Sequence, residues 1–424
     1  MPKPANKPKP VSAARAAAFE ILSRVEARRG NSDDLLHSSH TEKLSSEDRN
    51  LTTALVLGTL RWQIGLDARI QPLLQRPDQR LTESVALALR LGAFQLLYLD
   101  RIPAHAAINE SVELTRASGN PHAAGMVNAI LRKLAGQKLP GRPLHESAAA
   151  IARRLSHPEW LVERWIARYG RDTAIRICEA GQKEPNAPLL FNNPADAILP
   201  KMDDGSRLVA ELAAASSLSA GRVWDTCAAP GGKTLILAAR LPDAQTLATD
   251  VSERRLAAMR ARFGEYPYAA KIEMKVLDAT GPPSELGMFD LILADVPCSG
   301  TGTLARNPEI RLRLAPADLS RQAERQRQIL SASLGHLPVG GRLVYSTCSL
   351  EPEECEQVVD AVLAEQGIAG AYRVLPLEPV LNRLEEADLL REPLKGAVSG
   401  SYLRTLPGTH PGDGFFAAVV ERTA

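Results

Sequence analysis

Cysteine and aromatic residues are scarce in this sequence: of its 424 residues, five are cysteine and 4% are aromatic. The cysteines form no CxxC pair and the eight histidines show no ligand-like spacing, which argues against a disulfide framework or a zinc site. No apolar run reaches the roughly 18 residues that a membrane-spanning helix needs, and the Lys- and Pro-rich start lacks a signal-peptide pattern. We therefore expect a cytoplasmic protein with no metal and no membrane partner.

Net charge is nearly absent as well, because 51 Lys and Arg residues face 49 Asp and Glu residues, a balance of +2. Overall charge therefore predicts no particular partner. The distribution of charge is more informative, since residues 1–30 hold seven basic and two acidic side chains, and Arg-rich sequence returns at 306–327. Either patch could bind a polyanion, or could simply be a solvated surface.

The length predicts two or three domains, and 45% apolar residues are ample for packed cores. We expect a disordered tail at 1–10, a helical domain at 11–140, a linker with a short intermediate segment at 141–202, and an α/β domain at 203–424. The helical domain shows apolar residues at helical spacing and almost no strand pattern, with helices at 12–28, 50–66, 84–99, 107–117 and 123–134.

Strands alternate with helices in the last domain, which indicates a mainly parallel, doubly wound sheet. Further apolar runs at 372–377 and 415–420 would bring the sheet to seven strands. The five principal strands are expected at 222–227, 246–251, 272–278, 289–296 and 341–348, and the helices at 233–241, 252–263, 317–336 and 351–365.

The sequence DTCAAPGGKT, at 225–234, lies between the first strand and the first helix of this domain. Adjacent glycines let a backbone approach a ligand closely, and the start of the helix offers free N–H groups. Asp250, 19 positions after Gly231, is placed to bind a ribose hydroxyl. The pattern predicts a nucleoside-type cofactor, although such turns also occur without a ligand. A phosphate-binding GxxxxGK[ST] loop is excluded, because it needs glycine where this chain has Cys227.

Ligands of open α/β sheets collect at the carboxyl ends of the strands. Acids or thiols stand at four of these ends: Asp250, Asp278, Asp295 with Cys298, and Cys348. Neighbouring strands lie about 4.8 Å apart, so Cys298 and Cys348 would face one crevice if the last two strands are adjacent. The thiols are either reactive groups or buried structural cysteines. Cys178 and Cys355 sit in helical patterns and are expected to be structural.

Three motifs together resemble the RNA 5-methylcytosine methyltransferases, which use S-adenosylmethionine: DTCAAPGGKT, DVPCSGTGTLARNPEIR and LVYSTCSLEPEEC. The resemblance covers about 203–424, including the terminal GDGFFAAVV. The segments IPAHAAINESVELT and GMVNAILRKLA of the helical domain resemble the NusB-type RNA-binding fold. This fusion resembles the ribosomal RNA small subunit methyltransferase B (RsmB, or Sun) family. It implies a NusB-like domain followed by a Rossmann-like methyltransferase domain.

The resemblance also implies roles for individual residues. Cys348 would be the nucleophile, Cys298 would help to release the product, and Asp295, beside Lys233, would contact both cofactor and cytosine. Asp250 would hold the ribose hydroxyls and Asp278 the adenine edge. The cofactor loop would comprise Cys227, Ala228, Ala229, Pro230, Gly231, Gly232 and Lys233.

The reaction needs those groups, because carbon 5 of cytosine becomes nucleophilic only after a thiolate adds to carbon 6. An acid near the ring nitrogen and a group that assists elimination complete the set. The target base must also leave its stack, which costs a few kcal/mol. Basic residues Arg306, Arg311 and Arg313 could hold the flanking phosphates.

Several alternatives stay open at this point. The substrate implied is 16S rRNA, in an unstructured or pre-assembly form, but transfer RNA or another rRNA site would need the same chemistry. A non-catalytic RNA-binding or antitermination factor would keep only the helical domain's role. DNA 5-methylcytosine enzymes take their nucleophile from the proline-cysteine motif, here Cys298. The segment 194–202 is shorter than the family's usual intermediate subdomain, and we expect a monomer.

Overall fold

The structure, a computed structural model, describes residues 11–38, 41–76, 80–137, 146–185, 190–192, 199–217, 219–365 and 370–424. The chain divides into two compact units. Unit 1 comprises Met1–Lys183 with Ala305–Leu312, and unit 2 comprises Glu184–Leu304 with Arg313–Ala424. The short segment Ala305–Leu312 therefore belongs to the helical unit although both of its flanks belong to the other. The tail expected at 1–10 lies outside the described residues.

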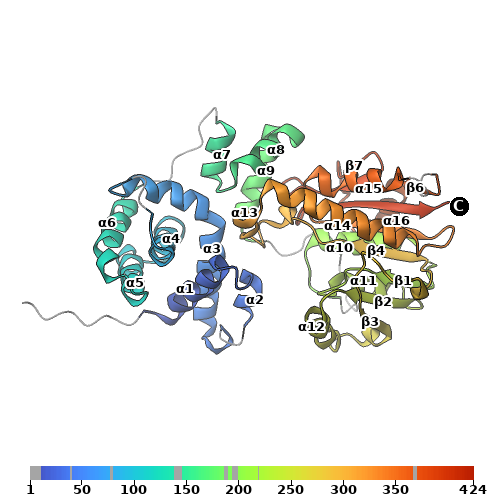
Figure 1. Cartoon of the computed structure of the whole chain (residues 1–424), viewed down its shortest axis with the longest axis horizontal. Helices are drawn as coiled ribbons and strands as arrows, with labels where there is room; N and C mark the ends of the chain where they lie inside the picture. Colours follow the sequence, from blue (N-terminus) through green and yellow to red (C-terminus); the bar gives the residue numbers. More distant parts are fainter. Residues whose placement is uncertain are drawn as a thin grey trace, which may run out of the picture. The chain divides into compact units, whose positions relative to one another are not determined.

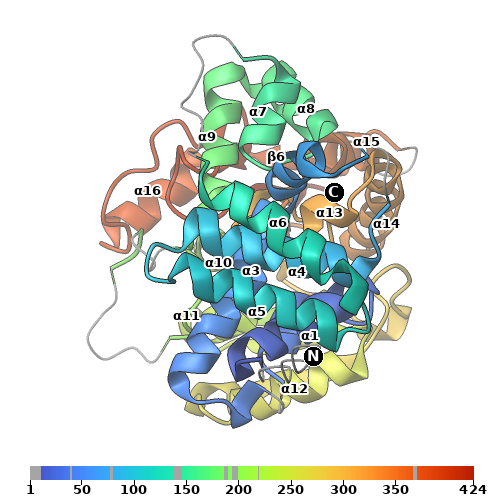
Figure 2. The same cartoon turned by 90° about the vertical axis from the view of Figure 1, so that its left-hand side faces the viewer.

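Unit 1 is helical throughout its described residues, as expected from the sequence, and Figure 2 shows α4, α5 and α6 side by side. Its core is one apolar cluster that includes fully buried Leu55, Leu87 and Leu131. Gly58 lets α3 and α4 approach closely, because a Cβ atom there would lie 2.0 Å from Phe94. The first six helices are α1 (Ala13–Glu26), α2 (Ser32–Leu36), α3 (Ser46–Ile70), α4 (Glu83–Tyr98), α5 (Ala104–Ala117) and α6 (Ala124–Ala135).

Three further helices of unit 1 follow the expected linker: α7 (Ala148–Arg154), α8 (Glu159–Tyr169) and α9 (Arg171–Gln182). The segment Ala305–Leu312 is fixed within this unit by polar contacts. Ser32 donates to Glu309 from its backbone N–H at 3.0 Å and from its hydroxyl at 2.9 Å. Arg61 donates to the carbonyl of Ala305 at 2.9 Å. The helical unit thus includes a piece of chain that the sequence pattern assigns to the α/β domain.

Unit 2 is built on one nine-stranded sheet with the order β3-β2-β1-β4-β5-β9-β8-β7, in which β6 also pairs with β9 (Figure 1). The first five strands are parallel, and β9 runs antiparallel to β5. The strands are β1 (Arg222–Asp225), β2 (Gln245–Asp250), β3 (Ile272–Val276), β4 (Leu291–Asp295), β5 (Arg342–Thr347), β6 (Tyr372–Leu375), β7 (Val398–Ser399), β8 (Tyr402–Arg404) and β9 (Phe416–Arg422).

Successive residues of the central strands alternate between two buried faces, as the pleat requires. Val223, Leu293 and Val344 pack in one cluster with α10 (Asp204–Ser216), α11 (Gly232–Arg240) and α16 (Glu378–Glu386). The residues between them, such as Trp224 and Tyr345, pack in a second cluster with α14 (Pro316–Leu334) and α15 (Glu356–Leu363). α12 (Glu253–Phe263) packs beside β2 and β3. Both faces of the sheet are covered by helices, so the strand ends are the part of the sheet left to bind a ligand.

The expected fold class is confirmed, and two details differ from the sequence prediction. The sheet has nine strands rather than seven, because the short strands β7 and β8 extend it beyond β9. The helix expected at 351–365 is interrupted: a 3-10 turn at Pro352–Glu354 precedes α15. Within the residues that the structure describes, no helix is long and apolar enough to cross a membrane.

Candidate active site

The two cysteines at the ends of the last two parallel strands lie side by side. β4 and β5 are parallel neighbours, with Asp295 opposite Ser346 in the register. Cys298 follows β4 and Cys348 follows β5, and their sulfur atoms lie 3.3 Å apart. One thiol can therefore donate a hydrogen bond to the other sulfur. Both side chains are half-buried, so a ligand can reach them.

Lys233 and Asp295 form an ion pair beside this thiol pair. The Lys233 ammonium lies 2.7 Å from one Asp295 oxygen and donates to the Ser206 hydroxyl at 2.8 Å. Ser346 donates to the other Asp295 oxygen at 2.8 Å. Burial lowers the pKa of Lys233, but the charge of Asp295 and its hydrogen bond outweigh burial and raise it overall. The site thus holds a fixed cation next to a carboxylate at the end of β4.

The glycine turn adopts the conformation that its sequence predicts. Gly231 has a φ of 97°, in the left-handed region that favours glycine. A Cβ atom at this position would lie 2.5 Å from Phe263 and 2.8 Å from Met259, so the turn packs closely on α12. α11 begins at Gly232, directly after the turn, with its first N–H groups at the carboxyl edge of the sheet.

Asp250 ends β2 and is buried, with a donor already on each carboxylate oxygen. Ser252 donates its backbone N–H at 2.9 Å, and Arg255 lies 3.0 Å from the second oxygen. Arg255 also donates to the carbonyl of Ala229 in the glycine turn. A carboxylate has about four acceptor positions, so ribose hydroxyls can bind Asp250 in addition. Arg255, which the sequence analysis missed, links the acid to the cofactor loop.

Asp278 is exposed beyond the end of β3. Its carboxylate accepts from the backbone N–H and the hydroxyl of Thr280, at 3.0 and 2.8 Å. The two Thr280 bonds lower the pKa of Asp278, which keeps the carboxylate charged. Val251 and Val276 lie near it, at the ends of the adjoining strands β2 and β3, and are 53% and 46% exposed. This apolar surface beside an acceptor suits an aromatic ring such as adenine.

Desolvation raises the pKa of the three other thiols and of one acid, Asp225, at the end of β1. Burial raises the pKa of Cys227 to about 12, so this thiol is protonated. Cys178 and Cys355 are buried, unlike the half-buried Cys227, and burial raises the pKa of each to about 12, as expected for structural cysteines. Asp225 at the end of β1 is buried and accepts from the Thr234 hydroxyl at 2.7 Å. Burial raises the pKa of Asp225 to about 7.

The pKa of Cys298 is raised well above its ordinary value. The causes are its hydrogen bond to Cys348, its burial, and the negative charges of Cys348 and Glu354. The raised pKa keeps Cys298 protonated, so its thiol is available to donate a hydrogen bond to the Cys348 sulfur, 3.3 Å away.

The three arginines expected to contact the RNA backbone differ in how far they are buried. Arg311 is 2% exposed and lies in unit 1, where its guanidinium donates to the carbonyls of Arg61, Ser156 and Gly181 at 3.0–3.1 Å. A guanidinium so enclosed does not face solvent, so we assign no phosphate contact to Arg311. Arg306 and Arg313 are half-buried. The basic run therefore contributes to the interior of unit 1, which charge patterning could not reveal.

Sequence reasoning also missed a buried carboxylate behind the thiols. Glu354 is fully buried and accepts hydrogen bonds from Ser299, Ser349 and Gln326. The signal that could have identified it is a repeated dipeptide, because Cys298 and Cys348 are each followed directly by serine. Within the described residues, no group of three or more His, Cys, Asp or Glu side chains could hold a metal ion.

Comparisons with known proteins agree with this geometry. The family model described as 16S rRNA methyltransferase RsmB/F matches residues 217–421, and the NusB family model matches residues 12–136. The probable ribosomal RNA small subunit methyltransferase B of Bacillus subtilis is 31% identical over 95% of this chain and 97% of its own. Ribosomal RNA small subunit methyltransferase B of Escherichia coli K12 is 32% identical over 89% of this chain and 91% of its own.

One solved structure, the crystal structure of PH0851, matches 98% of this chain and 100% of its own with a TM-score of 0.72. Its sequence is 19% identical, so this likeness shows the fold alone.

A Rossmann-like sheet whose carboxyl edge carries a glycine turn and acids suits a nucleoside-type cofactor, and the family match identifies it as the sheet of an S-adenosylmethionine-dependent methyltransferase. The chain belongs to the RsmB/F family of 16S rRNA methyltransferases, with a NusB-family domain at its N-terminus. The family expected from the motifs is thus confirmed, and the protein is an RNA methyltransferase of ribosomal RNA that uses S-adenosylmethionine.

Proposed function

We propose that the protein methylates carbon 5 of a cytosine in 16S rRNA, through a transient bond between Cys348 and carbon 6 of the base. The observation that carries this proposal is the thiol pair, with its sulfur atoms 3.3 Å apart at the end of the strands that also present Asp295. Methylation of a ring or exocyclic nitrogen needs no sulfur nucleophile. Two thiols at the site therefore favour a carbon atom as the methyl acceptor.

Addition to the base requires a thiolate and a proton source near the ring. The Cys298 thiol lies within hydrogen-bond distance of the Cys348 sulfur and can donate to it while that sulfur adds to the base. As sulfur adds to carbon 6, negative charge builds on ring nitrogen 3. The Lys233–Asp295 pair, 2.7 Å apart, can pass a proton to that nitrogen and take it back later. Carbon 5 then carries enamine electron density and becomes nucleophilic.

S-adenosylmethionine, when bound, supplies an electrophilic methyl group. After carbon 5 has gained the methyl group, its remaining proton and the Cys348 sulfur must both leave. Cys298 can give its proton to the departing Cys348 sulfur and take the carbon 5 proton in its place. The net products are the methylated base, the demethylated cofactor and one proton, which Cys348 releases to restore its thiolate.

The experiment that tests this function uses purified protein, protein-free 16S rRNA and methyl-labelled S-adenosylmethionine. We expect label in 5-methylcytidine after nucleoside digestion and mass spectrometry. Label in any other nucleoside would contradict the base and atom proposed. Label in 5-methylcytidine of transfer RNA, with none in 16S rRNA, would contradict the substrate.

A further inference from the structure

One buried carboxylate is shared by the loops that carry the two cysteines. The serine after each cysteine binds Glu354: Ser299 donates its backbone N–H at 2.8 Å and also its hydroxyl, and Ser349 donates its hydroxyl at 2.5 Å. The two serine hydroxyls are themselves 3.1 Å apart. A single side chain thus contacts the residue next to Cys298 and the residue next to Cys348.

A fourth bond fixes Glu354 from α14. The amide of Gln326 donates to the carboxylate oxygen that also accepts the Ser299 N–H, at 3.0 Å, and to the carbonyl of Pro297 at 2.8 Å. Pro297 directly precedes Cys298 in the chain. Glu354 is fully buried, and a buried charge is costly unless its hydrogen bonds are satisfied. An uncharged residue could fill the same space at lower cost, which points to a role beyond packing.

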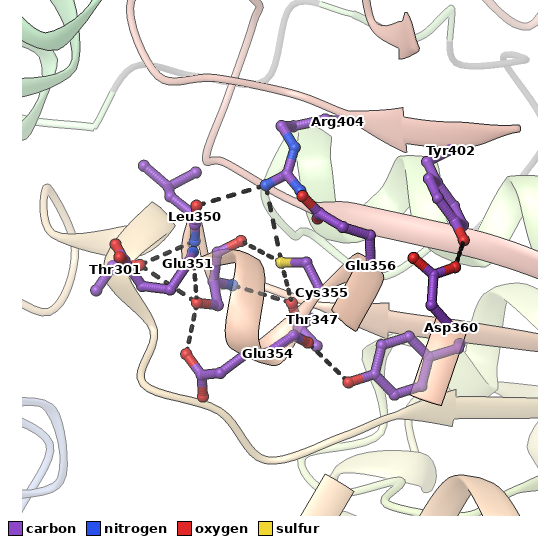
Figure 3. A network of polar contacts seen from close by, with 12 residues as sticks. Thr301, Thr347, Leu350, Glu351, Glu354, Cys355, Glu356, Asp360, Tyr402 and Arg404 are labelled. Carbon is purple, nitrogen blue, oxygen red and sulfur yellow. Dashed lines mark hydrogen bonds and ion pairs between the residues drawn. The ribbon is translucent and has the colours of Figure 1, made fainter. Parts of the chain in front are cut away.

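Two further hydrogen bonds, each donated by a backbone N–H, also join the two loops. The N–H of Gly302 donates to the carbonyl of Cys348 at 2.8 Å, and the Leu350 N–H donates to the Thr301 hydroxyl at 2.9 Å. Figure 3 shows Thr301 beside Leu350 and Glu351, with the Glu354 side chain below them in the view. One of these bonds ends on the carbonyl of Cys348 itself and the other joins residues two or more positions from the cysteines, whereas Glu354 contacts the residue after each cysteine.

We propose that Glu354 is a positioning residue that sets the spacing of the Cys298 and Cys348 thiols for addition to the base and release from it. This inference rests on the proposed function, because it assigns both thiols to the reaction. The negative charge of Glu354 also raises the pKa of Cys298, which favours the protonated form of that thiol. Glu354 touches neither thiol directly in any of the bonds described, so it acts through Ser299 and Ser349.

The test compares Glu354→Gln with Glu365→Gln, the same substitution at an exposed position just beyond α15. Glutamine keeps the shape but presents an N–H group where two donors now converge. We expect Glu354→Gln to lower kcat roughly 10- to 100-fold, with KM for RNA and Kd for S-adenosylmethionine within about two-fold. Glu365→Gln should match the wild type. A kcat for Glu354→Gln equal to that of the control would overturn the proposal.

A second measurement needs neither RNA nor cofactor. The oxidant diamide converts two adjacent thiols to a disulfide, and the rate of this reaction depends on their spacing. We expect Glu354→Gln to form the Cys298–Cys348 disulfide roughly ten-fold more slowly than Glu365→Gln. Equal rates would contradict the positioning role even if no RNA substrate is methylated. Failure of the wild type to make 5-methylcytidine would instead contradict the proposed function alone.

If Glu354→Gln does not fold, Ser299→Ala and Ser349→Ala decide the matter. Each removes one hydroxyl from the carboxylate and leaves the charge in place. We expect both variants to lower kcat and slow disulfide formation in the same direction as Glu354→Gln. Wild-type values for both serine variants would overturn the proposal.

Discussion

The sulfur atoms of Cys298 and Cys348 lie 3.3 Å apart although the two residues are 50 positions apart in the chain. The parallel pairing of β4 with β5 brings them together, and the buried carboxylate of Glu354 joins the serines that follow them. A thiol in hydrogen-bond contact with a second thiol can stabilise it as a thiolate and later return a proton. This relationship is the physical basis for assigning two different roles to two chemically identical side chains.

The first prediction concerns cofactor binding. Asp250→Ala removes the carboxylate at the end of β2 and leaves Arg255 without that partner. We expect the free energy of S-adenosylmethionine binding to weaken by roughly 1.5–3 kcal/mol, about 10- to 150-fold in Kd. Isothermal titration calorimetry measures the change. Glu253→Ala, at an exposed position three residues on, should bind as the wild type does, and an unchanged Kd for Asp250→Ala would disprove the ribose assignment.

The second prediction concerns pH. Burial raises the pKa of Asp225 to about 7, from the ordinary value of 3.8 that it has in the unfolded chain. Between these values the unfolded chain releases a proton that the folded protein keeps, so the free energy of unfolding falls as pH rises. The loss reaches about 1.4 kcal/mol for each pH unit in this range and ends above pH 7. Asp225→Asn cannot titrate and should lack this part of the slope.

Urea unfolding at pH 4.5 and pH 7 measures this slope for both proteins. The exposed residue Asp243 provides the control, because Asp243→Asn should keep the wild-type slope. Equal slopes in the wild type and Asp225→Asn would show that Asp225 is ionised in the folded protein throughout this range.

Much of the fold was predictable because its signals are local. Apolar periodicity located most helices, and the alternation of strands and helices gave the parallel half of the sheet. The glycine turn and the acids at the strand ends were predictable for the same reason, since each stands at a fixed place next to a recognisable strand. The short strands β7 and β8 were not, because two or three residues carry no periodic pattern and are held by pairing with neighbours.

The supporting residues of the site were not predictable, because their roles depend on contacts distant in sequence. Glu354 is one of three acids in the EPEE run at the expected start of a helix, yet a 3-10 turn forms there and its side chain is buried. Arg311 looks like a member of a basic patch, yet it is enclosed by carbonyls from three other segments of unit 1. Charge alone does not reveal whether a side chain faces solvent.

Arg311 provides a third prediction. Arg311→Ala leaves the carbonyls of Arg61, Ser156 and Gly181 without this donor, so we expect the free energy of unfolding to fall by roughly 2–4 kcal/mol. The dependence of RNA affinity on salt should stay unchanged, because no phosphate contact is lost. Chemical denaturation and RNA binding at several salt concentrations measure the two effects. A salt dependence that is weaker by one phosphate contact, with stability unchanged, would restore Arg311 to the RNA interface.

A fourth prediction concerns the NusB-family domain. The apolar cluster of unit 1 is formed almost entirely by residues 18–134, so residues 1–140 should fold alone as a helical domain. We expect it to bind RNA weakly, with affinity that falls as salt rises, because basic side chains displace counterions from phosphates. Circular dichroism and fluorescence anisotropy measure folding and binding. An affinity that does not change with salt, or no binding at all, would exclude an RNA role for this domain alone.

The roles of the two thiols are tested most directly by trapping the covalent bond to RNA. Cys348→Ala and Cys298→Ala are each incubated with 16S rRNA and S-adenosylmethionine and then separated on a denaturing gel. A protein without its nucleophile forms no bond to the base, whereas a protein without its elimination group forms the bond and releases it slowly. We predict no adduct and no methylation with Cys348→Ala, and an accumulated adduct with Cys298→Ala. An adduct with Cys348→Ala and none with Cys298→Ala would contradict the account and reverse the two roles.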